Sequence, residues 1–158
     1  MTESGALFDR TKKYRYLLWR QWADGPAITF VMLNPSTADA TKDDPTISRC
    51  ISFAKNWGYG RLEVVNLFAY RATESKRLLS VRNPVGREND DHIMESISRA
   101  QRILLAWGNC GQFFDRHAEV LELLFDEELF CLGMNLSGHP KHPLYVAQQA
   151  RPVSYVRS

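Results

Sequence analysis

Residues 27–36 read AITFVMLNPS, an apolar run that stops at an Asn-Pro-Ser turn. Because residues 27–33 carry no charge, the run predicts a strand that is covered on both faces, since a strand with one face in water would alternate. Similar runs follow at 62–67, 103–107 and 129–132. Helical patterns separate the runs, so strand and helix alternate along the chain, which is typical of an α/β fold with a mainly parallel sheet.

The segments between these runs have apolar side chains at the three- and four-residue spacing of amphipathic helices. Helices are predicted over residues 47–57, 89–101 and 113–125. Residues 14–22 alternate as YRYLLWRQW and precede the turn formers at 24–26, which predicts an antiparallel hairpin with the first apolar run. The expected architecture is three-layer α/β/α, with a mainly parallel four-stranded sheet plus an N-terminal antiparallel edge strand.

Length and composition predict one domain over residues 1–158, because the chain is 44% hydrophobic and 24% charged and contains no repeat or linker. Cys50, Cys110 and Cys131 are odd in number and form no C-x-x-C pair, which argues against a zinc site and for a reducing compartment. No segment resembles a signal peptide or a membrane span. We expect a cytoplasmic protein without a membrane partner, a metal or a cofactor.

The net charge of +2 does not by itself indicate a nucleic-acid partner. Its distribution is uneven, because residues 71–87 carry five basic residues and one acidic residue, whereas 109–128 carry six acidic residues and one basic residue. These segments are either ordinary solvated faces or, for the basic one, a rim that meets phosphates. In the second interpretation Arg71 and Lys141 are the candidate phosphate-binding residues.

Each predicted strand of the parallel sheet is followed by an unusual polar signature. The signatures are Asn34-Pro35-Ser36, Asn66, Trp107-Gly108-Asn109 and Gly138-His139-Pro140. Parallel strands end at the same edge of a sheet, and ligands of open α/β folds bind beyond that edge. The sequence therefore predicts a functional site where these four segments meet.

Two asparagines in these signatures suggest recognition chemistry. Asn34 can donate and accept hydrogen bonds and so position a water or a ligand, although Asn-Pro is also a common turn starter. Asn66 interrupts the apolar stretch VVNLF, and a buried amide costs about 1–3 kcal/mol unless it finds partners. Asn66 therefore either bonds the neighbouring backbone or presents a donor and an acceptor to a heterocycle.

The other candidates each have a structural and a functional interpretation. Asp44 either stabilises the start of the helix whose expected N-cap is Thr46, or binds a ligand. Trp107 is either a core residue or a stacking platform, and Gly108 permits close approach by a ligand or loop. His139 is either a surface histidine or a neutral hydrogen-bond donor or proton-transfer group. His139 and His142 lack the third ligand of a metal site.

Six sequence blocks resemble the bacterial family called domain of unknown function 1643, over residues 14–145. The blocks are MLNPSTAD, DDPTISRC, FAKNWGYG, VVNLFAYRAT, AWGNCG and GHPKHPLY. More distantly, the four strand ends resemble, in the same order, those of the uracil-DNA glycosylase superfamily. The likeness implies a glycosylase-like fold and a site that holds a base flipped out of DNA.

This second resemblance also implies roles for individual residues. Asn34-Pro35, with Ser36, resembles the water-activating loop, and Asn66 resembles the asparagine that reads the pyrimidine. Trp107-Gly108 resembles the end of the third strand. His139-Pro140 resembles the His-Pro motif whose histidine stabilises the departing base, and Leu144 resembles the residue wedged into the duplex. An asparagine where other glycosylases have an aspartate implies slow hydrolysis.

The resulting functional prediction is recognition of a nucleobase, with hydrolysis of an N-glycosidic bond in a flipped DNA base as the associated reaction. Two alternatives stay open. One is a hydrolase or binder of a free nucleotide or nucleoside. The other is a non-catalytic module that reads nucleic acid or a modified base. All three readings imply a nucleic-acid or nucleotide partner.

Overall fold

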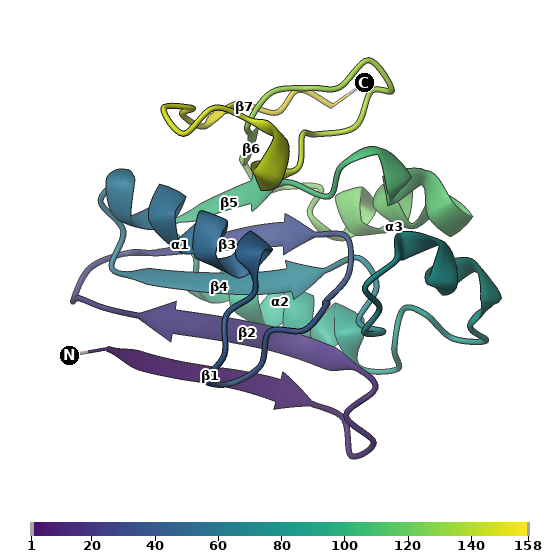
Figure 1. Cartoon of the computed structure of the whole chain (residues 1–158). Helices are drawn as coiled ribbons and strands as arrows, with labels where there is room; N and C mark the ends of the chain where they lie inside the picture. Colours follow the sequence, from purple (N-terminus) through teal and green to yellow (C-terminus); the bar gives the residue numbers. More distant parts are fainter. Residues whose placement is uncertain (1, 158) are drawn as a thin grey trace.

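A computed structural model of the protein describes residues 2–157 (Figure 1). The elements in chain order, with η for a short 3-10 helix, are β1 Glu3–Phe8, β2 Arg15–Gln21, β3 Ala27–Met32, α1 Pro45–Asn56, β4 Arg61–Asn66, η1 Ser75–Ser80, α2 Asn89–Arg99, β5 Arg102–Leu105, η2 Asn109–Asp115, α3 Arg116–Leu123, β6 Leu129–Cys131, η3 Pro143–Tyr145 and β7 Val153–Ser154. The strands form one open sheet in the order β1-β2-β4-β3-β5-β6-β7. This arrangement confirms the predicted mixed α/β class.

The centre of the sheet consists of β4, β3, β5 and β6, which run parallel to one another. These are the four strands that the apolar runs predict. The sheet has seven strands rather than the expected five: β2 is the expected antiparallel strand, and β1 and β7 add two more antiparallel strands at the borders. Strands β1 and β7 are partly exposed, and their sequences lack a clear apolar pattern. Local periodicity therefore did not predict these two strands.

The predicted hairpin between residues 14–22 and 27–33 is wrong. Strand β2 pairs with β1 on one side and with β4 on the other, and β4 lies between β2 and β3. The chain connects β3 to β4 through α1, and these two parallel strands become neighbours because a crossover helix can span them. Pairing of β2 with β4 is therefore a long-range contact that no local turn encodes.

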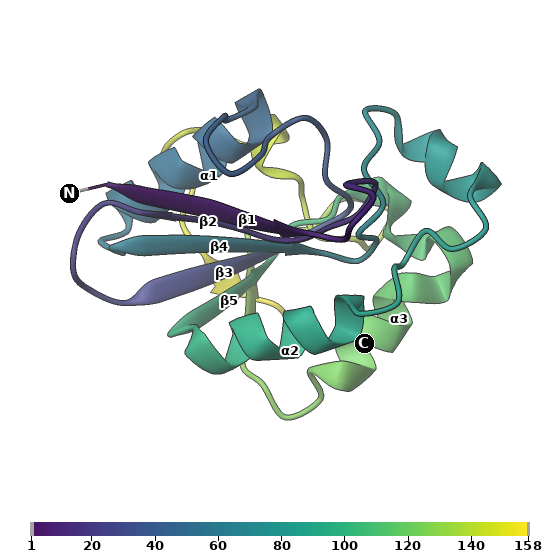
Figure 2. The ribbon, with the colours of Figure 1, turned by 90° about the horizontal axis from the view of Figure 1, so that it is seen from below.

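Helices cover both faces of the sheet: α1 lies on one face, and α2 and α3 lie on the other (Figure 2). The two faces have separate apolar clusters. One cluster joins Leu18 and Phe30 to α1 residues such as Phe53, and the other joins Leu17 to α2 residues such as Ile93. In the described part of the chain, no helix is long and apolar enough to cross a membrane.

Two helix boundaries differ from the sequence predictions. Helix α1 begins at Pro45, and its N-cap is Asp44 rather than Thr46. The Asp44 carboxylate accepts a hydrogen bond from the Ile47 amide, and proline is favoured at the first helical position because it lacks an N–H to satisfy. Helix α3 begins only at Arg116, because Phe114 and Asp115 adopt left-handed backbone conformations that interrupt the predicted helix.

A buried carboxylate links the sheet to α2. Glu63 of β4 is fully buried and accepts hydrogen bonds from Arg61 Nε at 2.8 Å, Arg99 Nε at 2.9 Å and Ser96 Oγ at 2.7 Å. Burial favours a raised pKa for Glu63, but the bonds from Arg99, Ser96 and Arg61 outweigh burial and hold the pKa below its ordinary value. Folding therefore stabilises the charged form.

We predict that Glu63→Gln lowers the free energy of unfolding by about 1–3 kcal/mol at pH 7, because the buried donors lose a charged acceptor. In urea denaturation, the wild type should lose this stabilisation as pH falls through the depressed pKa, whereas the variant should not. Glu95→Gln changes an exposed carboxylate on α2, the helix that carries Ser96 and Arg99, and should leave stability unchanged. Equal stability of wild type and Glu63→Gln at pH 7 would contradict this account.

Candidate functional site

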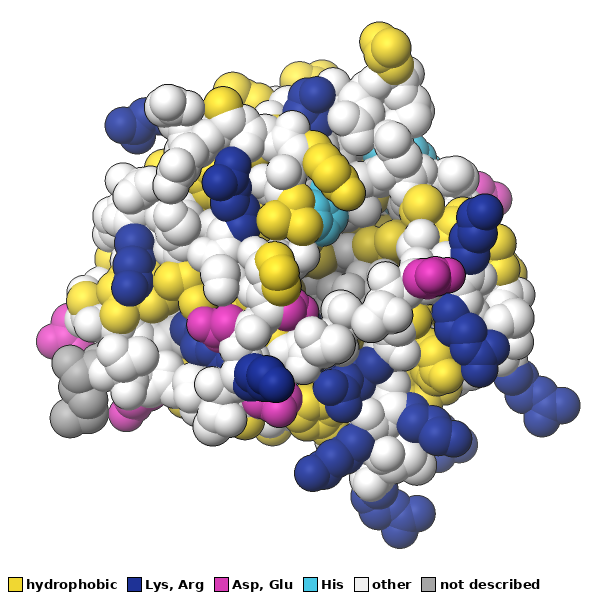
Figure 3. Space-filling model, in the orientation of Figure 1, with side chains coloured by type: hydrophobic (Ala, Val, Ile, Leu, Met, Phe, Trp, Pro, Cys, Tyr) yellow, Lys and Arg dark blue, Asp and Glu magenta, His cyan; other side chains and the backbone are white. Residues whose placement is uncertain are grey.

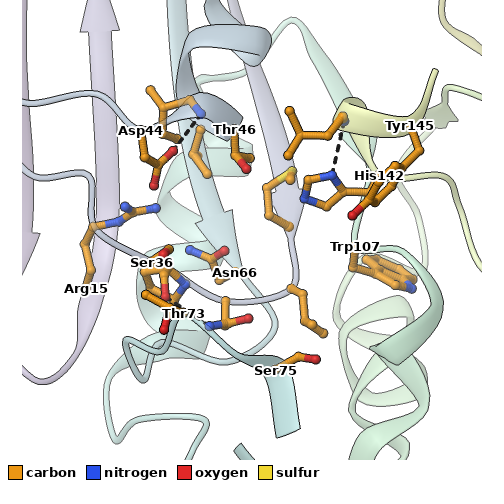
Figure 4. A pocket seen from close by; sticks show the side chains of 17 residues that line it. Arg15, Ser36, Asp44, Thr46, Asn66, Thr73, Ser75, Trp107, His142 and Tyr145 are labelled. Carbon is orange, nitrogen blue, oxygen red and sulfur yellow. Dashed lines mark hydrogen bonds between the residues drawn. The ribbon is translucent and has the colours of Figure 1, made fainter. Parts of the chain in front are cut away.

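A cavity of about 280 Å³ opens beyond the carboxyl ends of the parallel strands (Figure 4). Figure 3 shows the same face of the molecule, hollowed near its centre beside hydrophobic and histidine side chains. Seven of the predicted site residues line the cavity: Asn34, Pro35, Ser36, Asp44, Asn66, Trp107 and Leu144. Three of the four strand-end signatures therefore contribute residues to the cavity wall, whereas Gly138-His139-Pro140 does not, and the roles of these residues stay predictions.

The Asn66 side chain is the central feature of the cavity wall. Asn66 is the last residue of β4 and is 1% exposed. Among residues 2–157, neither its Nδ2 nor its Oδ1 has a hydrogen-bond partner. Its backbone oxygen is satisfied by Asn89, whose side-chain Nδ2 donates to it at 2.8 Å. The side chain thus keeps a free donor and a free acceptor at the cavity, at a cost of about 1–3 kcal/mol.

His142 supplies the imidazole of the cavity, a role that the sequence prediction gave to His139. Its Nδ1 accepts a hydrogen bond from the Leu144 amide at 3.2 Å, so the neutral ring carries its proton on Nε2. Burial lowers the pKa of His142, although the nearby Asp44 charge opposes that effect. A neutral Nε2–H donor is therefore available near neutral pH.

His139 is not among the lining residues but contacts Trp107, which is. Its Nδ1 accepts a hydrogen bond from Trp107 Nε1 at 3.1 Å, and its ring meets that of His117 edge to face. Burial, together with the His117 side chain, lowers the pKa of His139. The structure therefore gives His139 a supporting contact with the cavity wall. The signal that could have identified His142 is the second His-Pro pair in HPKHPLY, which immediately precedes Leu144.

The loop after β3 is held by side-chain contacts to the backbone. The Asn34 Nδ2 donates to the carbonyl oxygens of Pro35 at 3.0 Å and Ala72 at 2.8 Å, which leaves its Oδ1 as an acceptor. The Asp44 oxygens accept from the amides of Ile47 at 2.9 Å and Ala38 at 3.2 Å. Both candidates thus have structural duties, and each Asp44 oxygen accepts one hydrogen bond from a backbone amide.

The three remaining predicted residues lie outside the cavity. Gly108 has a φ of 77°, which favours glycine, and its amide donates to Pro140 at 2.9 Å, so it helps to hold the loop that carries His142. Arg71 lies in a neighbouring hollow with Lys12 and Lys13.

Lys141 lies apart from both hollows, in a third one lined by residues such as Asn109 and Met134. Only Arg71 of the two predicted phosphate-binding residues is therefore adjacent to the cavity. Its hollow shares Ser36 and Thr73 with the cavity wall. Within residues 2–157, no three His, Cys, Asp or Glu side chains gather as a metal-ligand set.

Sequence reasoning did not identify Arg15, which also lines the cavity. Figure 4 shows Arg15 on one side of Asn66, with His142 and Trp107 on the other. Hydroxyl-bearing residues, among them Ser36 and Thr46, complete the polar part of the wall. The cavity therefore combines an amide, an imidazole, a guanidinium and hydroxyls, a set that suits a polar ring with an anionic substituent.

Comparison with known proteins identifies one family. A family model described as "Protein of unknown function (DUF1643)" matches residues 15–144. No curated protein and no solved structure matches the chain.

We predict that Asn66→Leu raises the free energy of unfolding by about 1 kcal/mol, because it removes an unsatisfied buried amide from an apolar strand. Asn89→Leu is the matched control: the Asn89 amide is also buried, but its Nδ2 donates to the oxygens of Asn66 and Leu67, and its loss should destabilise the protein. Chemical denaturation measures both. A destabilised Asn66→Leu protein would show that the amide has a structural partner.

We also predict that stability falls as pH is lowered from 7 to 5. The unfolded histidines have a pKa of about 6.5, whereas burial lowers the pKa of His139 and His142 in the folded state. The unfolded chain therefore binds protons first, and the stabilisation present above pH 6.5 is lost as pH falls through the folded pKa values. The double variant His139→Gln/His142→Gln should show a shallower pH dependence in thermal denaturation. An unchanged slope would refute the assignment.

Proposed function

Because the chain belongs to the DUF1643 family, whose description assigns no activity, we infer its function from the site and propose that the cavity binds a nucleobase. The observation that carries the proposal is the buried, unpartnered side chain of Asn66. An amide presents one donor and one acceptor side by side, and pyrimidine and purine edges present the complementary pair. A bound base would satisfy both atoms at once.

The rest of the wall is consistent with a planar ring. His142 Nε2–H can donate to a carbonyl oxygen of the base, and the Trp107 indole, held by its bond to His139, borders the same space. The volume of about 280 Å³ lies just below the usual range of ligand pockets, about 300–1,000 Å³. A single nucleoside or nucleotide unit suits such a space better than a dinucleotide.

We propose a base flipped out of DNA as the simplest source of that ring. The basic hollow with Lys12, Lys13 and Arg71 adjoins the cavity and suits a phosphate backbone. Leu144 and Tyr145 line the cavity and are 41% and 82% exposed, so apolar side chains are available to fill the space that a flipped base leaves. The likeness of the strand ends to uracil-DNA glycosylases supports the same reading, as an analogy.

The proposed reaction is hydrolysis of the N-glycosidic bond. The bond between the sugar C1′ and the base nitrogen breaks, its electron pair stays on the base, and water forms the new C1′–O bond. His142 Nε2–H and Asn66 stabilise the base anion, while Asn34 Oδ1 accepts a hydrogen bond from the water. Asn34 cannot take up the water's proton at neutral pH, so that proton passes to the solvent, and the released base anion is protonated from the solvent. Turnover should therefore be slow.

To test the proposal, oligonucleotides with uracil, hypoxanthine or mismatched bases would be incubated with the protein, and abasic products cleaved with alkali. We expect one or more bases to be bound and slowly released, and Asn66→Leu to abolish both. Asn56→Leu, which changes an exposed asparagine at the end of α1, should behave as wild type. Asn34→Ala should reduce turnover more than binding.

Three outcomes distinguish the alternatives. Binding without an abasic product identifies a module that reads a base without hydrolysing it. Binding of oligonucleotides that weakens steeply with salt indicates contacts with strand phosphates, whereas weak salt dependence and binding of free nucleosides indicates a small-molecule ligand. If no base, nucleoside or oligonucleotide binds, the proposal is wrong.

A further inference from the structure

A buried arginine with unused donors forms one end of the cavity. Arg15 is 2% exposed, and the hydrogen bond that its side chain makes within residues 2–157 runs from Nη1 to the Ala38 carbonyl at 3.2 Å. Its Nε has no partner there. Burial lowers the pKa of Arg15 to about 10, which still leaves the guanidinium charged at neutral pH. A buried charge with so few partners is costly.

A β-bulge directs this side chain toward the cavity. In the pairing of β1 with β2, Leu7 lies opposite Leu17 and Phe8 lies opposite Arg15, so Tyr16 is the extra residue. Tyr16 stacks on His92 of α2, and Leu17 packs in the cluster on the same face of the sheet.

Two successive residues therefore face α2, and Arg15 is turned to the α1 face, where it lines the cavity. In a regular strand Arg15 would share the face of Leu17. Bulges often re-aim side chains beside functional sites.

Arg20, on the same strand and also buried, shows what a structural arginine looks like here. It forms an ion pair with Asp43 at 2.9 Å and donates to the carbonyl oxygens of Trp19 and Asp39. No such ion pair joins Arg15 to a carboxylate among the described residues. Asp44 is the acid whose charge acts on Arg15, and both of its oxygens already accept backbone bonds.

The surroundings of Arg15 favour an anion. The hydroxyl-bearing residues Ser36, Thr46 and Thr73 line the same cavity. The basic hollow of Lys12 and Lys13 shares Ser36 and Thr73 with the cavity wall, so positive charge continues outward from the Arg15 end. Figure 3 shows Lys and Arg side chains gathered on the lower right of this face.

We propose that Arg15 binds the phosphate group of the nucleotide whose base contacts Asn66, so that the ligand class is a nucleotide and not a free base or nucleoside. This inference rests on the proposed nucleobase site. Figure 4 shows Asn66 between Arg15 and the pair His142 and Trp107, which gives the cavity a base end and a phosphate end. Guanidinium groups suit phosphate because their planar donors can bond two of its oxygens.

The phosphate has two sources, a free nucleoside monophosphate or a nucleic-acid strand. Both place one phosphate at Arg15. A strand also carries further phosphates, which would reach the hollow of Lys12 and Lys13, and a free monophosphate has none to offer there. Substitution of the two lysines therefore distinguishes the sources without altering the cavity wall.

The test is calorimetry with deoxynucleosides, their 3′- and 5′-monophosphates, inorganic phosphate and a single-stranded oligonucleotide. In the wild type, a monophosphate should bind about ten- to a hundredfold more tightly than its nucleoside. Arg15→Gln should abolish that ratio and leave nucleoside binding within about twofold. Arg20→Gln should keep the ratio, even where it lowers stability. Lys12→Ser/Lys13→Ser should weaken binding of the oligonucleotide alone if a strand is the ligand.

Arg15→Met provides a second readout, the melting temperature. Replacement of a structural arginine should lower it, whereas replacement of a ligand-binding arginine should not. Loss of a poorly partnered buried charge should leave the melting temperature unchanged or raised. The inference is overturned if monophosphates bind no tighter than nucleosides, or if Arg15→Gln keeps the ratio.

The two proposals fail separately. Nucleoside binding without a phosphate preference overturns the role of Arg15 and leaves the base site standing. If the wild type binds inorganic phosphate as tightly as it binds nucleotides, and Arg15→Gln abolishes this binding, the anion site stands and nucleobase recognition is wrong. If no probe binds, both are wrong.

Discussion

Parallel pairing on both sides of β3 is the constraint on which the site depends. Strand β3 pairs in the same direction with β4 and β5, and Met32 lies opposite Asn66. Parallel neighbours end at one edge of the sheet, so the segments after β3, β4, β5 and β6 all leave from that edge. Residues that are far apart in the sequence thereby surround one cavity. The register sets Asn66 in its wall, because a shift of one residue would turn the amide to the opposite face.

Buried polar groups of this protein fall into two sets. Glu63 and Arg20 are buried and have partners that offset the loss of water, and Asn89 donates twice through its Nδ2, although its Oδ1 has no partner among residues 2–157. Asn66 and Arg15 are equally buried, and their side chains lack most of the partners that they can bind within the described chain. Native interiors rarely leave such groups unsatisfied. Both members of the second set line the same cavity, so their cost has a common explanation in a ligand that satisfies them together.

Local patterns predicted the parallel strands, because buried strands consist of apolar runs, but not the partners of β2, which are set by long-range pairing. Asn66 was identified because it interrupts an apolar run. Arg15 was missed because regular alternation assigns it to the face of Leu17, and the bulge at Tyr16 has no clear signature in the sequence. The sequence did not distinguish His139 from His142, because each histidine precedes a proline. The conformation of the loop decides which imidazole lines the cavity.

The loops around the cavity are held in ways that favour binding over rapid chemistry. Asn34 anchors its loop to Ala72, and Asp44 ties the start of α1 to Ala38, so the walls need little rearrangement when a ligand enters. Such preorganisation lowers the entropic cost of binding. Asn34, the side chain proposed to hold the water, is an amide and cannot take up its proton. A nucleotide bound between Asn66 and Arg15 would therefore be held firmly by a site that activates water only weakly.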